Sequence, residues 1–155
     1  MVLHSAEAED ECYDWFFPAI TGDLDRLKEM VSTRLNGGNL TNFLASYKGR
    51  YGQTVFHFAA SAGSIQICQY LVEELNLNVD DFISDKGFTP LHSAIVGESF
   101  DVAFYLLDKG ANPNAAENRG LTPLHMAATI GILVVLLCLG NFLHFFCLIA
   151  LHSML

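Results

Sequence analysis

Apolar residues in the first 110 positions recur at offsets of three and four, which is the spacing of one buried face on a helix. Two segments show this spacing most clearly, SIQICQYLVEEL at 64–75 and SFDVAFYLLDKG at 99–110. A third, DLDRLKEMV at 23–31, shows it as well. We predict three amphipathic helices, with buried positions at Leu24, Leu27 and Val31, at Ile67, Tyr70 and Leu71, and at Val102, Leu106 and Leu107.

The chain also repeats itself with a period of about 33 residues, the length typical of a helical repeat. Three segments align: YGQTVFHFAASAG, KGFTPLHSAIVGE and RGLTPLHMAATIG. Their threonines, Thr54, Thr89 and Thr122, stand 35 and 33 positions apart. In each segment a glycine precedes the threonine by two positions, a histidine follows it by three and an alanine by five. Three matches in one register are strong evidence of a repeat.

The repeated residues are those that begin a helix after a turn. Glycine permits a left-handed backbone in the turn, and threonine is a common N-cap. Pro90 and Pro123 follow the threonine, at the first helical position, where a missing N–H is tolerated. Gly110 is suited to end the second helix. Each repeat is therefore predicted to be a turn followed by two helices.

These residues resemble the ankyrin repeat. The TPLH motif at 89–92 and 122–125, the alanine after it, and GANPN at 110–114 match the pattern of that family. The resemblance covers residues 14–131 as about four units, of which the first is atypical and the last incomplete. LVEELNLNVD and LLDKGANP are similar to plant proteins of the ankyrin–tetratricopeptide type, without the tetratricopeptide part. Two departures stand out: Val55 and Phe56 replace Pro and Leu, and Glu98 replaces a glycine.

The resemblance implies an all-α fold, an ankyrin-repeat solenoid of helix–turn–helix units. From the apolar residues that follow the repeats we expect a hydrophobic C-terminal helix that crosses a membrane. The predicted divisions are a flexible acidic N-terminus at 1–13, the repeats at 14–131 and the hydrophobic helix at 132–155.

The last part of the chain differs sharply in polarity. Every Asp, Glu, Lys and Arg stands at or before Arg119, and from Ile130 to Leu151 the side chains are polar only at Asn141, His144 and two thiols. At about 1.5 Å per residue these residues would span about 33 Å as a helix, enough for the roughly 30 Å core of a bilayer. Because the segment is apolar all round, it leaves no face for water.

Three interpretations of 130–151 stay open. The first, which we favour, is a single C-terminal span that contacts membrane lipid and holds the repeats on the cytoplasmic face of a membrane. The second is a buried helix that completes the repeat stack of a cytosolic protein. The third is the product of an altered transcript, in which the true continuation after Gly131 is lost.

Composition excludes some classes of partner. The formal net charge is −9 with only eight Lys and Arg, so we expect no nucleic-acid binding, which needs basic stripes. The four cysteines show no disulfide framework or C-x-x-C pair, which is typical of a reducing compartment. The N-terminus lacks a basic region followed by an apolar run, so we expect no secretory signal.

No catalytic group, metal site or cofactor is predicted, and we expect no enzyme. His57, His92 and His125 occupy equivalent positions in successive repeats, and helices about 8–10 Å apart cannot bring them to one zinc ion. We expect each histidine to connect its turn to the neighbouring repeat. DDFISD at 80–85 lacks the spacing and the glycine of a calcium loop.

Stacked repeats offer a surface for another protein, whose identity the sequence does not indicate. Tyr51, Phe88 and Arg119 are the predicted anchors, because aromatic residues and arginine dominate interface energetics. The alternative for each is an ordinary solvent-facing turn residue. By resemblance, the partner-binding residues lie in the turns: Lys48, Arg50, Tyr51, Gln53, Ile83, Asp85, Lys86, Phe88, Asn118, Arg119 and Leu121.

The predicted function is thus a protein–protein interaction scaffold tethered to a membrane. The alternative is a soluble chaperone-type adaptor or an enzyme-regulating subunit. In that case the chain could also be a truncated product.

Overall fold

The structure, a computed structural model, describes the backbone of residues 6–34 and 40–130 and the side chains of residues 14–33 and 42–130. Within these ranges all regular secondary structure is helical. The helices in chain order are α1 (Ala6–Thr21), α2 (Leu24–Arg34), α3 (Leu40–Ser46), the 3₁₀ turn η1 (Arg50–Gly52), α4 (Val55–Ser61), α5 (Ile65–Gln69), the π-helical turn η2 (Tyr70–Glu74), α6 (Pro90–Val96), α7 (Phe100–Asp108) and α8 (Pro123–Ile130).

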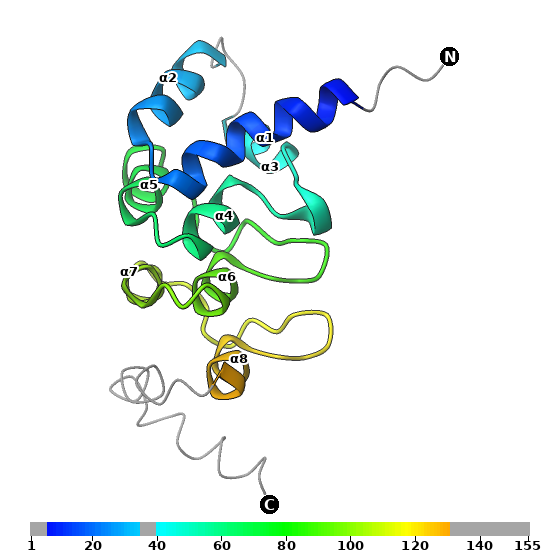
Figure 1. The fold of residues 1–155 in the computed structure, drawn as a ribbon. Coiled ribbons are helices and arrows are strands. Elements are labelled where there is room, and N and C mark those ends of the chain that lie inside the picture. The colour runs from blue at the N-terminus through cyan, green and yellow to red at the C-terminus, as the bar shows by residue number, and fades with distance from the viewer. Residues whose placement is uncertain (1–5, 35–39, 131–155) are drawn as a thin grey trace, which may run out of the picture.

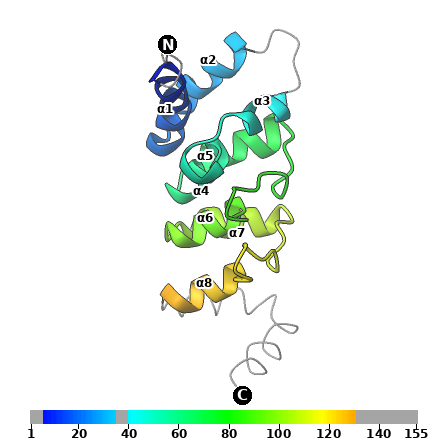
Figure 2. The ribbon, with the colours of Figure 1, turned by 90° about the vertical axis from the view of Figure 1, so that its right-hand side faces the viewer.

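The helices stack in two rows along one axis (Figures 1 and 2). An inner row is formed by α1, α4, α6 and α8, each of which contacts the next. An outer row contains α2, α5 and α7, which pack on α1, α4 and α6 respectively. The first three units are each a pair of helices joined by a short turn, and α8 is the first helix of a fourth, so the predicted all-α solenoid is confirmed for the described residues.

The core lies between the two rows and contains the predicted apolar positions. Small side chains let the inner helices approach closely: Ala59, Ala94 and Ala127 have no exposed surface. Leu24 and Leu107 are only half-buried, but they pack against the core. Fully or almost fully buried among the predicted positions are Leu27, Val31, Ile67, Tyr70, Leu71, Val102 and Leu106.

Helix α3, which the sequence pattern did not predict, closes the first unit with an aromatic cluster. Trp15 of α1 is almost fully buried, and its ring lies 5.3 Å from that of Phe43 and 5.6 Å from that of Tyr47, measured between centroids. Leu44 of α3 is also buried. A helix of seven residues is marginal by itself, so α3 is stabilised by this packing rather than by its own propensity.

The second unit ends its outer helix without a glycine. Residues Tyr70–Glu74 widen into the π-helical turn η2, and Asn76 takes the left-handed conformation with φ 55°. Gly110, with φ 90°, follows the outer helix in the next unit. Asparagine tolerates this region better than most residues, which explains how the chain turns here.

Glu98 also lies in the left-handed region, with φ 56°, where the previous unit has Gly63 at φ 75°. The Glu98 side chain is exposed, so replacing it removes little packing. We expect Glu98→Gly to raise the free energy of unfolding by about 0.5–1 kcal/mol, because relief of backbone strain exceeds the entropy cost of glycine. Urea denaturation measures the change. Glu98→Ala is the control: it removes the carboxylate, keeps the strain and should give no gain.

The two ends of the chain fall partly outside the described residues. Helix α1 begins at Ala6, inside the segment 1–13 for which the sequence predicts a flexible end. Alanine and glutamate at positions 6–9 have high helix propensity, which favours an early start. The predicted hydrophobic helix at 132–155 lies outside the described residues. Within 6–34 and 40–130, none of the helices has both the length and the apolar character needed to span a bilayer.

Candidate partner-binding surface

Three turns project from one edge of the stack (Figure 1), and each leads into an inner helix: α4, α6 or α8. We call these turns the turn tips and define them as residues 48–53, 83–88 and 117–121. All the residues predicted to bind a partner lie in them. The repeat geometry therefore brings the predicted site together on one edge.

Hydrogen bonds join neighbouring turn tips into a row. The N–H of Asp85 donates to the carbonyl oxygen of Tyr51 at 3.0 Å, and the N–H of Asn118 donates to that of Lys86 at 2.9 Å. The side-chain amide of Asn118 also donates to the carbonyl of Asp85 at 2.8 Å. These bonds use backbone groups that a mobile loop would leave to water. The turn tips are thus presented as one connected surface.

Each turn tip is also closed internally. In the first, the N–H of Gly49 donates to the carbonyl of Gln53 at 2.7 Å, and equivalent bonds of 2.9 Å join Ser84 to Phe88 and Glu117 to Leu121. In the second, the Ser84 hydroxyl also accepts the Phe88 N–H at 3.0 Å.

Glu117 organises the third turn tip from inside. Its side chain is 2% exposed, and one carboxylate oxygen accepts the N–H groups of Arg119 at 2.9 Å and Leu121 at 3.4 Å. Burial acts to raise the pKa of this carboxyl, but the two N–H groups and the Arg119 guanidinium outweigh it, so the pKa lies below its ordinary value. No pattern in the sequence distinguishes Glu117, because its role depends on the fold of the turn.

His57 and His92 connect each turn tip to the next repeat, and both rings are fully buried. The threonine three residues earlier donates its backbone N–H to Nδ1 at 3.2 Å in each case. Because Nδ1 accepts, the hydrogen-bond network assigns the proton to Nε2. Nε2 then donates to the carbonyl of Phe88 at 2.8 Å and of Leu121 at 3.2 Å. The predicted connecting role is confirmed for these two histidines.

His125 repeats only half of this arrangement. Its Nδ1 accepts the N–H of Thr122 at 3.2 Å, but the side chain is exposed, and Nε2 has no hydrogen bond to the described part of the chain.

The buried histidines predict that stability decreases in mild acid. Burial lowers the pKa of both imidazoles below the ordinary 6.5. The unfolded chain therefore binds more protons below about pH 6.5, and the free energy of unfolding falls as pH falls from there toward the folded-state pKa values. Urea denaturation at about pH 7.5 and about pH 5.5 should show the loss. A rise in stability toward pH 5.5 would contradict this interpretation.

The predicted partner-binding residues divide by exposure. Tyr51 and Ile83 are each 54% exposed. Phe88 and Leu121 are half-buried and pack against the core, and the Phe88 ring lies 5.4 Å from the His92 ring. Phe88 therefore stabilises the turn tip by packing and offers a partner less surface than the predicted anchor role requires. The residues that offer most surface are Lys48, Arg50, Tyr51, Ile83, Asp85, Lys86, Asn118 and Arg119.

Tyr51 and Lys86 form a pair across two turn tips. The Lys86 ammonium lies 3.9 Å from the centroid of the Tyr51 ring, within the range of a cation–π interaction. The Tyr51 backbone is left-handed, with φ 71°, which is uncommon for an aromatic residue. The sequence predicts both residues as partner-binding residues, but only the geometry of the repeats shows that they contact each other.

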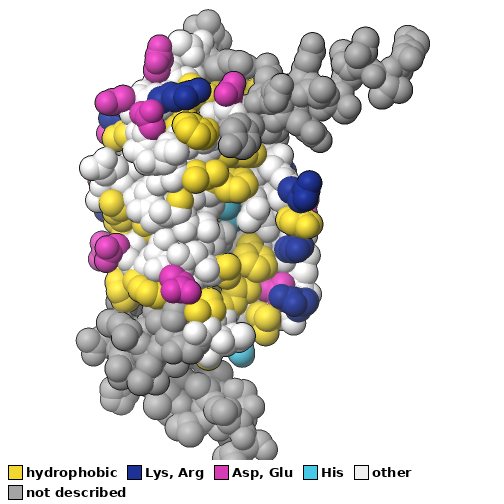
Figure 3. Space-filling model, in the orientation of Figure 1, with side chains coloured by type: hydrophobic (Ala, Val, Ile, Leu, Met, Phe, Trp, Pro, Cys, Tyr) yellow, Lys and Arg dark blue, Asp and Glu magenta, His cyan; other side chains and the backbone are white. Residues whose placement is uncertain are grey.

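Most of the charged side chains in the turn tips are cationic. Four of the eight Lys and Arg of the chain lie in the turn tips: Lys48, Arg50, Lys86 and Arg119. Figure 3 shows Lys and Arg following one another along this edge, although some Asp and Glu lie beside them and others lie at the top and on the rest of this face. At the outer helices, Lys28 of α2 pairs with Glu74, and Lys109, which caps α7, pairs with Glu73, each at 2.9 Å.

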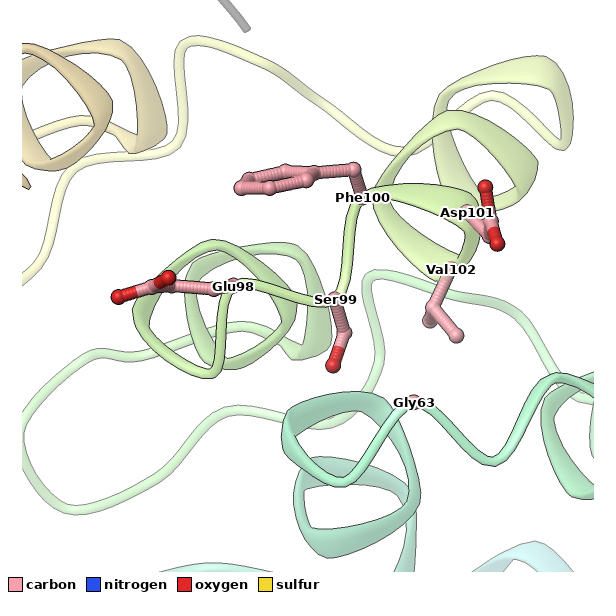
Figure 4. Close-up of a pocket in the computed structure, with 6 residues that line it drawn as sticks. All are labelled: Gly63, Glu98, Ser99, Phe100, Asp101 and Val102. Carbon is pink, nitrogen blue, oxygen red and sulfur yellow. The ribbon is translucent and has the colours of Figure 1, made fainter.

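A shallow hollow of about 200 Å³ lies elsewhere, at the turns between inner and outer helices (Figure 4). Ser99 points toward the Gly63 turn and donates to the carbonyl of Ser61 at 3.0 Å, joining two repeats. Glu98 and Asp101, also at the rim, point in opposite directions. The hollow is a seam between repeats, with no group of side chains converging on one point.

The fold and the row of turn tips define a helical-repeat scaffold. A sequence model of ankyrin repeats, in three copies, matches residues 19–117. The chain belongs to the ankyrin repeat family, and as such it is a protein–protein interaction module.

Several known proteins are similar to this chain in sequence. Ankyrin repeat domain-containing protein 53 of Macaca fascicularis is 35% identical over 125 residues, which is 78% of this chain and 23% of that protein. The probable 26S proteasome regulatory subunit p28 of Saccharomyces cerevisiae is 30% identical over 69% of this chain and 52% of its own length. The RelA-associated inhibitor of Mus musculus is 37% identical over a segment that covers 46% of this chain and 8% of that protein. The chain thus spans about half of these relatives or less. The narrower resemblance to plant proteins stays a prediction.

Proposed function

We propose that the chain captures a partner protein through the row of turn tips, without catalysing a reaction. The observation that carries the proposal is the row of turn tips. Hydrogen bonds between neighbouring turn tips hold their exposed residues in place on the stack of helices. A surface ordered before binding loses less conformational entropy when a partner docks. Exposed Tyr51 and Arg119 belong to the residue types that dominate interface energetics.

A peptide-display selection on the immobilised full chain tests this proposal. Enriched peptides should lose binding to Lys86→Gln/Arg119→Gln, which alters the turn tips. They should keep binding to Lys28→Gln/Lys109→Gln, which removes the same charge from the outer helices α2 and α7. Peptides that bind both variants equally would place the binding surface elsewhere.

We also propose that the segment 130–151 holds this module on the cytoplasmic face of a membrane. The support is compositional: residues 120–155 contain no Asp, Glu, Lys or Arg. An uncharged stretch of this length matches the thickness of a bilayer core. Expression of the full chain, followed by carbonate extraction of the membranes, tests the tether. Retention in the pellet supports it.

Recovery in the supernatant would instead favour a chaperone-type adaptor or a regulatory subunit. The relative whose printed name describes a proteasome regulatory subunit gives that second candidate its support.

A further inference from the structure

We infer that the partner segment held by the turn tips is an acidic peptide in extended conformation, an inference that rests on the proposed function. The first support is the distribution of charge. The turn tips hold four cations and two carboxylates, a formal charge of +2, whereas the whole chain carries −9 and the remainder therefore −11. The positive edge attracts an acidic segment, whereas the acidic remainder of the surface repels it.

The second support is that all four cations are exposed, whereas only one of the two carboxylates is. Glu117 is buried and accepts N–H groups of its own turn, and Asp85 lies 3.8 Å from the Lys48 ammonium. Within the part of the chain that the structure describes, Arg50 and Lys86 form no ion pair. Arg119 keeps an exposed guanidinium beside Glu117, with its side chain 75% exposed. The accessible charge of this edge is therefore positive.

The third support is the register of the side chains. Tyr51, Lys86 and Arg119 each stand immediately before the glycine of their turn tip, so they occupy the same position in successive repeats. Successive packed helices lie about 8–10 Å apart, close to the length of three residues of extended chain at about 3.1–3.3 Å each. An extended peptide with a carboxylate at every third residue would meet Lys86 and Arg119 in turn, and a further apolar group would reach the Tyr51 ring.

Fluorescence anisotropy with synthetic peptides tests the inference on the full chain. The probe is a fluorescein-labelled peptide of about twelve residues with Asp or Glu at every third position in a Pro/Ser background. Its matched partner carries Asn or Gln at those positions. The acidic peptide should bind at least about fivefold more tightly, and its affinity should fall when salt rises from about 50 to about 500 mM, because exposed ion pairs are screened.

Variants locate the contact. Lys86→Gln/Arg119→Gln should weaken the acidic peptide about fivefold or more, whereas Lys28→Gln/Lys109→Gln should leave it within about twofold. Equal losses in both variants, or equal binding of the acidic and amide peptides, would overturn the inference. Tighter binding of a single-stranded oligonucleotide of the same length would overturn it in favour of nucleic acid. If display selection yields tip-dependent peptides without acidic residues, the proposed function stands and only this inference falls.

Discussion

Replacing His92 with alanine should lower the free energy of unfolding by about 3 kcal/mol. The side chain is fully buried, and both ring nitrogens are bonded, to the N–H of Thr89 and the carbonyl of Leu121. Truncation removes the ring from the core and leaves both backbone groups without a partner. Because the whole domain is expected to be stable by only about 5–15 kcal/mol, this loss is large. Urea denaturation near neutral pH measures it.

His125→Ala is the matched control for this prediction. His125 has the same bond to its threonine but an exposed ring and no bond from Nε2 to the described residues. Its loss should be about 1 kcal/mol or less. If His92→Ala proves too unstable to study, His92→Gln keeps a donor and an acceptor and should fall between the two. Equal losses at 92 and 125 would show that the bond to the next repeat contributes little.

The second large effect is expected at Gly87, where alanine should cost about 2–3 kcal/mol. Gly87 has φ 81°, and a Cβ there would lie 2.9 Å from the N of Asn118 and 3.0 Å from the Cα of Glu117, both backbone atoms of the next turn tip. The substitution therefore adds a clash between turn tips to the cost of a left-handed alanine. Thermal or urea unfolding measures the total loss in the free energy of unfolding, which is the sum of these two costs.

Gly120→Ala separates those two costs. Gly120 has nearly the same conformation, with φ 85°, but no atom of the described residues lies within 4 Å of a Cβ built there. It should lose only the conformational part, about 1–2 kcal/mol. The difference between the variants then measures the close approach of the second and third turn tips. A Gly120→Ala loss as large as that of Gly87→Ala would mean that the turn tips are not tightly joined.

Much of this fold is readable in the sequence, because its signals are local and repeat. The threonines at 54 and 89 precede helices at the predicted places, and Pro90 and Pro123 are the first residues of α6 and α8. The sequence did not reveal α3, since its helix depends on Trp15, which lies 28 positions before Phe43. Contacts between residues so far apart leave no periodic signal.

The candidate site was predictable as a set of positions but not as an arrangement. The spacing of the repeats predicts that Tyr51 and Phe88 lie in turns. It does not show that Tyr51 is exposed and contacts Lys86, whereas Phe88 packs on His92. Exposure of a turn residue depends on the neighbouring repeat, which the sequence of one turn does not encode. The burial of Glu117 is a second example, because it follows from N–H groups that converge only in the folded turn.

Hydrogen–deuterium exchange of the full chain with and without a peptide selected by display tests the central claim most directly. If the row of turn tips binds the partner, amides in 48–53, 83–88 and 117–121 should exchange more slowly in the complex. Amides of the outer helices α5 and α7 should exchange at unchanged rates. Slower exchange confined to α2, α5 and α7, with the turn tips unchanged, would contradict the account.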